Sequence, residues 1–419
     1  MTDRVSRGTS TVSRRGLLAG LGAGGLVLAG VGTGTARADA GDEVWRVDVG
    51  DFTPTPPAVG EGLVVVGSDA FHAFDEDGDE LWEHDSPTHD VPVDPHIDDG
   101  TVYVAGHESG MSGEGYGLYA LDDDGEVTWE GDWEETEEFI PEPDGFGSGI
   151  ASDEDHVYIT GGTFLYALDR DTGEALWSFN NGAFQQGTNW GTPTVVDDLV
   201  IAGHNGGDVH AVDRITGEEV WTYDGGNNRF SSAVIRDGVA YIGTRDPEII
   251  GLAVDAEGEV VWEHTIEDDS SAGGLAIVDG SLVFGTGNGT VYSVDVDADD
   301  PDEQVEWSAS TGGSPGAPAV GQERLYVGAD ESIHALKRDD GEDAWQSSVG
   351  SEVRGTAVSG STLYVTDSEG GLSALDLGDD AAAGEETDDD DGLPGFGAPA
   401  ALLGLGGAAY LLRDRFTGE

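Results

Sequence analysis

The sequence predicts an all-β fold, an eight-bladed β-propeller in which each blade has four antiparallel strands. Three observations support this prediction: a strand–turn–strand unit recurs along the chain, its period suits a propeller blade, and no helical pattern separates the copies. Seven periods separate Trp45 from Trp345, which gives about 43 residues per unit. Four short strands fit into that length, so each unit corresponds to one blade.

The clearest copy of the unit is Leu165–Trp177, LYALDRDTGEALW. Its first strand alternates apolar and polar residues up to an Asp. A turn follows in which Gly supplies the position with positive φ, and the second strand ends in Trp. Because the tryptophans are regularly spaced and each belongs to its own unit, we expect them to pack between blades. The other complete copies end at Trp82, Trp129, Trp221, Trp262, Trp307 and Trp345.

Two further strands precede each hairpin. The first contains small residues with Pro or Gly, and we expect it to line the axis of the ring, where the taper leaves little room. The second follows a turn such as Asp-Gly and is rich in β-formers. Copies of the first strand lie near Ala58, Thr194, Val234, Ala276, Ala319 and Ala357. Copies of the second begin at Leu63, Thr101 and His156 and recur in the later units.

The two ends of the array predict how the ring closes. It starts with half a unit, Val44–Val49, and ends with LSALDL at Leu377, a copy that lacks its Trp strand. We therefore expect the N-terminal strand to pair beside Leu372–Leu377 and complete the eighth blade. Closure of this kind removes exposed sheet edges that would otherwise aggregate.

The composition is strongly acidic. Asp and Glu number 85 against 17 Lys and Arg, a formal net charge of −68, yet 37% hydrophobic residues suffice for a packed core. The acid is spread through every unit, which favours adaptation to very high salt, where a Debye length of about 3 Å at 1 M screens the repulsion. The alternative is an acidic surface for a cationic partner. The charge argues against nucleic acid as a ligand, and the lack of Cys excludes disulfides and thiol chemistry.

The N-terminal segment has the features of an export signal. Arg14 and Arg15 precede a Gly-rich, mildly apolar run, and small residues up to Ala38 offer a cleavage site. The segment resembles a twin-arginine (Tat) signal, which implies export of the folded chain and a mature start near Asp39. An amphipathic or disordered tail is the alternative.

The C-terminal segment has the features of a membrane anchor. An acidic linker is followed by Pro394, Gly395 and Phe396, an apolar run over Ala398–Leu412, and two arginines. This arrangement resembles the PGF-CTERM sorting signal, which implies that an archaeosortase replaces the span by a lipid anchor. A permanent transmembrane anchor is the alternative. Both place the folded domain at the outer face of the membrane, and together with the acidity they imply a haloarchaeal protein. The predicted segments are a signal peptide at 1–38, a propeller at 39–377, a linker at 378–392 and a sorting segment at 393–419.

The hairpin units resemble the PQQ-like (pyrroloquinoline quinone) repeat, most clearly over Ala167–Trp177 and Ala211–Trp221, and the resemblance covers Val44–Leu377. It implies one of two groups: quinoprotein alcohol dehydrogenases, which bind pyrroloquinoline quinone and Ca²⁺, or non-catalytic propellers such as the lipoprotein subunit of the outer-membrane β-barrel assembly machine. The fold cannot choose between them. The chain lacks the Cys needed for the dehydrogenases' vicinal disulfide and the long insertions that cap their cofactor, so we expect neither cofactor.

The loops that enter the innermost strands converge on one mouth of the central channel, and there the units differ most. Amides, a Trp and two arginines in these loops could hold a sugar, a peptide or an anion. Alternatively these loops are merely polar, and the Trp covers its own blade. The candidate ligand-binding residues are Gln185, Gln186, Asn189, Trp190, Asn227, Asn228, Arg229 and Arg354.

Two groups of residues suggest a metal, and we predict a site at neither. The first falls within one blade but has no recurring spacing that would fix a geometry. The second is a pair of Asp-rich stretches that resemble calcium loops but occupy the unit's own turn. The first group is His89, Asp90, Asp94, His96 and His107, and the second is Asp75–Glu80 and Asp122–Gly125.

These features favour an exported, surface-anchored propeller that binds a surface protein, peptide or glycan and has no catalytic residues. We expect it to be a monomer. A quinoprotein-like oxidoreductase and a carbohydrate-binding module are the alternatives, and the sequence does not identify the ligand.

Overall fold

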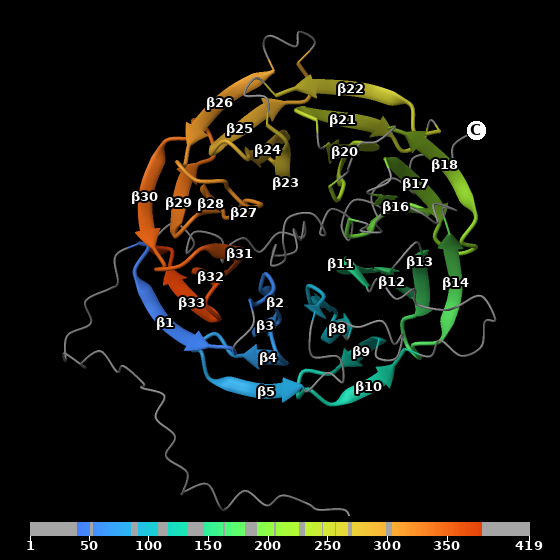
Figure 1. Ribbon diagram of the computed structural model, residues 1–419, viewed down its shortest axis with the longest axis horizontal. Coiled ribbons are helices and arrows are strands. Elements are labelled where there is room, and N and C mark those ends of the chain that lie inside the picture. Colours follow the sequence, from blue (N-terminus) through green and yellow to red (C-terminus); the bar gives the residue numbers. More distant parts are fainter. Residues whose placement is uncertain are drawn as a thin grey trace, which may run out of the picture. The chain divides into compact units, whose positions relative to one another are not determined.

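The part of the chain described by the structure forms a ring of eight β-sheets, which confirms the predicted eight-bladed propeller (Figure 1). Neighbouring strands in every sheet are antiparallel, and in seven of the eight sheets strand order follows the chain from the axis outward. The predicted signal peptide and sorting motif lie outside the described residues. The computed structural model describes residues 40–50, 53–84, 91–107, 116–131, 146–161, 164–180, 191–204, 207–225, 231–244, 246–255, 257–266, 270–298 and 304–378.

The innermost strands lie nearest the centre of the ring in Figure 1. In the second blade this position is shared by two short strands, β6 and β7, which both pair with β8. The innermost strands are β2 (Ala58–Gly60), β6 (Val91–Pro92), β7 (His96–Asp98), β11 (Phe146–Ser152), β15 (Thr194–Val196), β19 (Val234–Arg236), β23 (Ala272–Val278), β27 (Ala319–Val320) and β31 (Val353–Ser359).

The two middle strands of each blade are almost wholly buried, because both of their faces pack against neighbouring blades. The second strands are β3 (Leu63–Gly67), β8 (Thr101–His107), β12 (His156–Gly161), β16 (Leu199–Gly203), β20 (Val239–Gly243), β24 (Ser281–Thr286), β28 (Arg324–Ala329) and β32 (Thr362–Asp367). The third strands are β4 (Phe71–Phe74), β9 (Tyr116–Leu121), β13 (Phe164–Asp169), β17 (Asp208–Asp213), β21 (Glu248–Ala253), β25 (Thr290–Asp295), β29 (Ser332–Lys337) and β33 (Gly371–Asp376).

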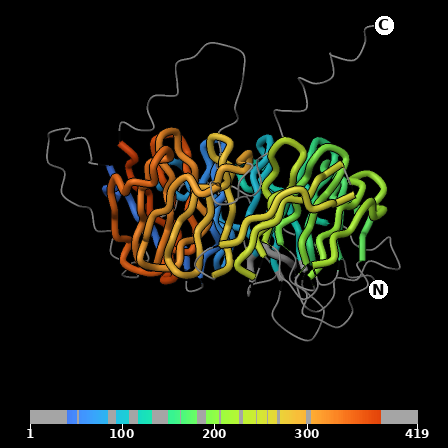
Figure 2. Tube along the Cα trace, turned by 90° about the horizontal axis from the view of Figure 1, so that it is seen from above, coloured from blue at the N-terminus to red at the C-terminus, as the bar shows by residue number. Residues whose placement is uncertain are grey.

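The outermost strands alternate exposed residues with the buried or half-buried Trp, as expected for a strand with one solvated face. Figure 2 shows the ring from the side, with the turns gathered at its two faces. The described residues contain no helix with the length and apolar character needed to cross a bilayer. The outermost strands are β5 (Glu80–His84), β10 (Val127–Glu130), β14 (Ala175–Asn180), β18 (Glu219–Asp224), β22 (Val260–Thr265), β26 (Val305–Ser310), β30 (Asp343–Ser348) and β1 (Glu43–Asp48).

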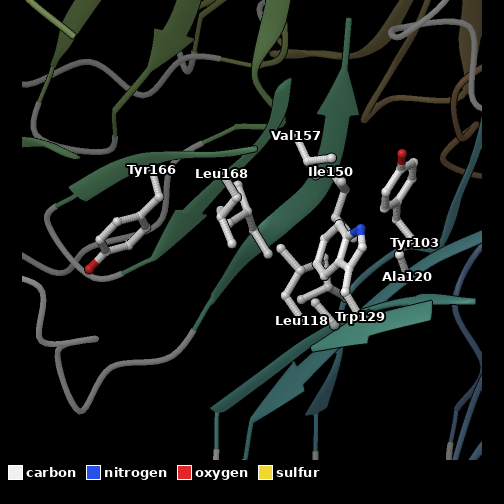
Figure 3. Close-up of a cluster of buried hydrophobic side chains, with 11 residues drawn as sticks. Tyr103, Leu118, Ala120, Trp129, Ile150, Val157, Tyr166 and Leu168 are labelled. Carbon is white, nitrogen blue, oxygen red and sulfur yellow. The ribbon is translucent and has the colours of Figure 1, made fainter. Parts of the chain in front are cut away.

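Apolar clusters fill the spaces between adjacent blades. One cluster joins Tyr103, Leu118 and Trp129 of the second blade to Ile150 and Leu168 of the third (Figure 3). All five side chains are at most 8% exposed. Since each cluster draws on two blades, no blade has a core of its own and the ring is stable only as a whole.

The Trp that ends each hairpin docks on the next blade, which confirms the predicted packing between blades. Trp129 Nε1 donates a hydrogen bond to the carbonyl oxygen of Arg170 at 2.7 Å, and a Cβ at Gly173 would lie 2.4 Å from the Trp129 ring. Gly173 also has a φ of 73°. Glycine is therefore favoured at this position for two reasons, the positive φ and the close approach of the Trp129 ring. The same turn glycine contacts the preceding blade's Trp at Gly78, Gly125, Gly217, Gly258 and Gly341.

The predicted closure is confirmed. Strand β1 pairs antiparallel with β33, with Trp45 opposite Ala374 and Val47 opposite Leu372. The final sheet has the order β1-β33-β32-β31, so its outermost strand comes from the other end of the array. Gly41 contacts the Trp345 ring. It thus takes the part that the glycine of the hairpin turn has in other blades.

Candidate functional site

The candidate site lies at the axis of the ring, where the innermost strands of neighbouring blades touch. A Cβ at Gly149 would lie 2.4 Å from Thr192 Oγ1 of the next blade, and one at Gly355 would lie 2.4 Å from Pro56 Cα. Side chains larger than hydrogen would therefore collide with the next blade at these positions. The contacts account for the small residues that the sequence places in these strands.

The axis has a polar arc and a small, uncharged arc. In the polar arc, Asp94 forms a parallel β-bridge with Gly149, and the Thr192 amide donates to Ser232 Oγ at 3.0 Å. The remaining arc uses residues without side-chain polar groups, and a Cβ at Gly274 would lie 2.3 Å from the Ala317 Cβ. The two arcs thus differ in the polar groups that their own residues carry. The small, uncharged arc consists of Gly274, Ala317, Gly355 and Pro56.

Asp94 is the unusual residue of this arc. Desolvation of the partly buried carboxyl raises its pKa from about 3.8 to about 7. Near neutral pH a large fraction of Asp94 is therefore protonated. In that form the carboxyl both donates and accepts hydrogen bonds, as a hydroxyl does.

A crevice of about 60 Å³ adjoins the small, uncharged arc. Arg354, at the start of β31, contributes to its lining together with Val353 and Thr356. The Arg354 side chain is 40% exposed and lies 3.4 Å from Glu352 Oε1. The guanidinium is thus accessible to an incoming anionic group at the edge of the axis.

Arg354 is the residue of the sequence-predicted site that falls within the described part of the chain. Gln185, Gln186, Asn189 and Trp190 directly precede Gly191, whereas Asn227, Asn228 and Arg229 come shortly before Ser231. All seven lie outside the described residues, so their part in a site stays a prediction. The chain positions that follow them, from Gly191 and Ser231 onward, belong to the polar arc.

Antiparallel alternation places the ends of the outermost strands at one face of the ring. Within a blade the first and third turns lie at one face, whereas the second turn and the link to the next blade lie at the other. The outermost strands β14 and β18 therefore end at the same face of the ring, the face at which the next innermost strands, β15 and β19, begin. The position of segments 181–190 and 226–230 at one mouth of the axis stays a prediction.

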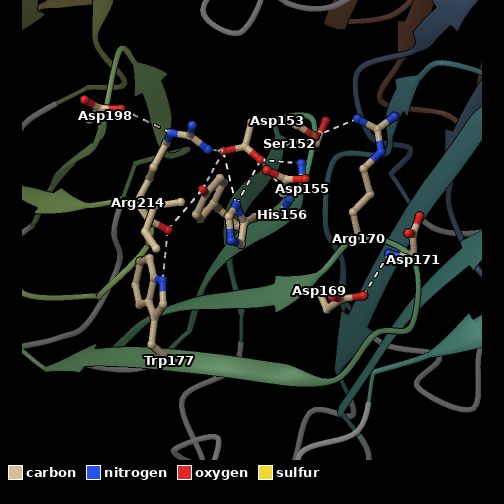
Figure 4. Close-up of polar contacts among 12 residues, drawn as sticks. Ser152, Asp153, Asp155, His156, Asp169, Arg170, Asp171, Trp177, Asp198 and Arg214 are labelled. Carbon is tan, nitrogen blue, oxygen red and sulfur yellow. Dashed lines mark hydrogen bonds and ion pairs between the residues drawn. The ribbon is translucent and has the colours of Figure 1, made fainter.

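The interfaces between blades hold a second set of polar residues, centred on Asp153 (Figure 4). Its carboxylate accepts hydrogen bonds from Tyr158 Oη at 2.7 Å and Arg214 Nη1 at 3.0 Å, and His156 Nδ1 lies 3.0 Å away. Burial alone would raise the Asp153 pKa, but the hydrogen bonds from Tyr158 and two backbone amides outweigh it and lower the pKa. Asp153 is thus an ionised anchor between the third and fourth blades.

Several described cations of the propeller belong to such contacts. Arg170 Nη1, for example, lies 2.7 Å from Asp98 Oδ2 and 2.6 Å from the Asp153 carbonyl oxygen, and so connects the second and third blades. These cations support the ring and are neutralised by acids. The further pairs between blades are Arg236–Asp297 and Arg338–Asp279, whereas Arg46–Asp367 and Lys337–Glu342 each lie within one blade.

The two metal candidates of the sequence have structural roles where they are described. His96 Nε2 is 2.9 Å from Ser152 Oγ in the next blade. Asp75 Oδ1 accepts the amides of Asp77 and Asp79, which is the turn chemistry expected of the unit, and Asp122 does the same in the next hairpin. His89, Asp90 and the side chain of His107 lie outside the described residues.

The special environment of Asp94 was not predicted from the sequence. When the units are aligned, Asp94 in VDPHI occupies the position that Thr192 has in GTPTV and Ala317 has in GAPAV. The unusual residue is therefore visible in the sequence. The sequence gives the position but not the desolvation, which depends on the neighbouring blade.

A protein-family model described as outer membrane protein assembly factor BamB matches residues 31–140, 117–347 and 288–383 of the chain. A comparison with curated proteins gives no match.

Three solved structures share the fold. The computationally designed Ika8 protein is 16% identical with a TM-score of 0.66, over 80% of this chain and 100% of that one. BamB from Moraxella catarrhalis is 16% identical with a TM-score of 0.62, over 80% and 99% of the two chains. Saccharomyces cerevisiae Sqt1 is 11% identical with a TM-score of 0.63, over 81% and 99%. At these identities the likeness concerns the fold alone.

Proposed function

The chain belongs to the family described as outer membrane protein assembly factor BamB, and from this premise we propose that it is a non-catalytic scaffold that binds a partner protein at the mouth of its axis. In the full proposal the propeller is exported and stays tethered to the outer face of the membrane by its C-terminal segment. The partner is a surface protein.

The observation that carries the proposal is that the blades differ from one another at the axis. Elsewhere the units use the same Trp, turn and salt-bridge contacts to hold the blades together. At the axis the polar arc of Asp94, Thr192 and Ser232 differs from the small, uncharged arc. The most variable loops are predicted to lie beside these arcs. A rigid ring that presents diverged loops is the usual arrangement of a binding site on a scaffold.

The distribution of charge supports binding rather than quinone chemistry. Pyrroloquinoline quinone carries three carboxylates and needs a cationic or hydrogen-bonding grip. Among the described residues, Arg354 is a cation beside the axis, and it has Glu352 at 3.4 Å. Arg170 and Arg214 are held in contacts between blades. This distribution of the described cations supports the scaffold over a quinone enzyme.

The sequence of the two ends supports tethering. The twin arginines at 14–15 and the Pro-Gly-Phe motif at 394–396 are the features on which export and anchoring rest. The acidic linker 378–392 repels itself and can extend to about 50 Å. A propeller on such a tether reaches proteins at the membrane surface without being fixed in one orientation.

Affinity capture from a membrane fraction at the native salt concentration tests the proposal. The bait is the wild-type protein, and the test variant carries Trp190→Ala and Arg354→Ala at the mouth of the axis. Glu263→Gln on the outermost strand β22 is the matched control, because it also changes an exposed residue but lies away from the axis.

We expect wild type and Glu263→Gln to capture the same protein and the double variant to lose it. Equal capture by all three would place binding elsewhere and contradict the proposal. Stoichiometric binding of pyrroloquinoline quinone with Ca²⁺, followed by dye reduction, would also contradict it, in favour of an oxidoreductase.

A further inference from the structure

A histidine recurs at one position of the hairpin unit and always meets an acid. It occupies the second or third residue of the third strand, and its Nδ1 lies 3.2 Å or less from a carboxylate two residues before the Trp of the outermost strand. The pairs are His72–Glu80 at 3.0 Å, His210–Glu219 at 3.2 Å and His334–Asp343 at 2.9 Å. A pair that recurs in three blades is part of the architecture and by itself indicates no ligand.

The first blade adds a second carboxylate to this pair. Glu83 lies directly opposite His72 in the pairing of β4 with β5. The equivalent residue is Thr222 opposite His210 and Gln346 opposite His334, neither of which can bring a negative charge. Glu83 thus converts a structural pair into a set of one imidazole and two carboxylates.

The three side chains are close enough to share one ion. One donor atom each from His72, Glu80 and Glu83 lie within 4.8 Å of one another. Metal–ligand bonds of about 2.0–2.2 Å separate two ligands of one ion by at most about 4.4 Å. Glu80 is 49% exposed, so its side chain can make the remaining adjustment without disturbing the core.

The second nitrogen of His72 is buried near a third carboxylate. The His72 side chain is 12% exposed, and among the described residues its buried Nε2 accepts or donates no hydrogen bond. Asp69 Oδ1 lies 3.9 Å from this atom. When Nδ1 binds a metal, Nε2 carries the proton, and a carboxylate near it fixes the ring orientation and strengthens the ligand.

We propose that His72, Glu80 and Glu83 form a binding site for one divalent transition-metal ion on the outer half of the first blade, with Asp69 orienting the imidazole. An imidazole nitrogen selects an ion such as Zn²⁺ over Ca²⁺ and Mg²⁺, which prefer all-oxygen sites. The two carboxylates neutralise the charge of the ion. The site lies on the two outer strands of its blade and is independent of the axis.

Calorimetric titration of the purified full-length protein with Zn²⁺ tests the site. The solution contains about 1 M salt and excess Mg²⁺, so that surface carboxylates are screened and sites made only of oxygen are occupied. Glu83→Thr copies the fourth blade and Glu83→Gln copies the seventh. Glu263→Gln is the matched control, because Glu263 has the same place in its hairpin but stands opposite Ile250. Thr222→Glu rebuilds the three-ligand set in the fourth blade.

We expect wild type and Glu263→Gln to bind one Zn²⁺, and both Glu83 variants to bind it at least about tenfold more weakly. Thr222→Glu is expected to bind two ions. Equal affinity of wild type and Glu83→Gln would overturn the proposal, as would an equal loss in Glu263→Gln. A Thr222→Glu protein that still binds one ion would show that this set of ligands is insufficient and would likewise overturn it.

Discussion

Arg46 and Asp367 form an ion pair that joins the first strand of the ring to its last blade across 321 residues of sequence. The Asp367 side chain is 1% exposed, whereas that of Arg46 is 34% exposed. Arg46 Nη1 also donates to Ser373 Oγ at 3.0 Å and to the Val349 carbonyl oxygen at 3.3 Å. The closing strand is therefore held by a buried polar contact as well as by its backbone pairing.

Arg46→Ala should destabilise the ring because it leaves the Asp367 carboxylate buried without its cation. We expect a loss of about 1–3 kcal/mol, below the range for fully buried pairs because Arg46 is partly solvated. Urea unfolding at constant salt measures it. Arg354→Ala is the control, since its pair with Glu352 is exposed and should change stability by no more than about 0.5 kcal/mol. Equal midpoints for wild type and Arg46→Ala would rule out a role for this pair in closure.

Gly173→Ala should cost more than backbone strain alone. The residue has a φ of 73°, and an added Cβ would lie 2.4 Å from the Trp129 ring, so we expect a loss of about 2–4 kcal/mol. Gly238→Ala is the matched control, because its φ is 77° but nothing lies within 4 Å of the added Cβ.

For Gly238→Ala we expect about 1 kcal/mol, the cost of the conformation. Thermal unfolding of both variants at the same salt gives the difference, which isolates the contact between the turn and the Trp of the preceding blade. Equal losses would mean that this contact contributes nothing to the interface.

The repeating contacts explain why so much of the fold was predictable from the sequence. A unit such as Leu165–Trp177 contains both the residues that form its turn and the Trp that packs on the next blade. The number of units and their period therefore predict the number of blades in the ring. The closure followed from the half units at the two ends. The inner strands β6, β7 and β11 were not predicted from the sequence, because their segments depart from the small-residue pattern of the other blades.

The candidate site was less predictable because its properties arise between blades. The desolvation of Asp94 depends on its surroundings in the ring, including the bridge to Gly149 of the next blade. The approach of His72, Glu80 and Glu83 depends on the register and bulge of one hairpin. Sequence spacing alone gives neither relationship, although the aligned units do show that Asp94 differs from its counterparts and that Glu83 differs from Thr222 and Gln346 in the two other hairpins with this His.

Asp94 should make stability fall as the pH rises from about 4 to about 7. Its pKa is raised from 3.8 to about 7 by burial, so between these values the folded chain binds a proton that the unfolded chain has released. The stabilisation by the neutral carboxyl is complete below the unfolded pKa and is lost as the pH passes through the folded pKa.

Asp94→Asn cannot ionise and should lack this contribution. Across that range we expect wild type to lose about 2–4 kcal/mol relative to the variant, which urea unfolding at a series of pH values measures. The comparison with Asp94→Asn cancels the titration of the other acids. A constant difference between the two proteins at all pH values would contradict the raised pKa.

Salt should stabilise the protein through its net charge of −68. Raising the ionic strength from about 0.1 M to about 1 M shortens the Debye length from about 10 Å to about 3 Å and screens repulsion between carboxylates of the folded ring. We expect the melting temperature to rise steadily with KCl, as differential scanning calorimetry would show. Sucrose at the same osmolality is the control, because it screens no charge. Equal effects of KCl and sucrose would argue against electrostatic strain in the fold.

Site-specific photo-crosslinking at the cell surface tests the proposed scaffold function most directly. A photoreactive residue at position 354 samples the mouth of the axis, and one at position 263 samples the outermost strand of the fifth blade. We predict that the residue at 354 crosslinks to one surface protein with high yield and that the residue at 263 does not. Crosslinking to the same protein from 263 but not from 354 would contradict binding at the axis.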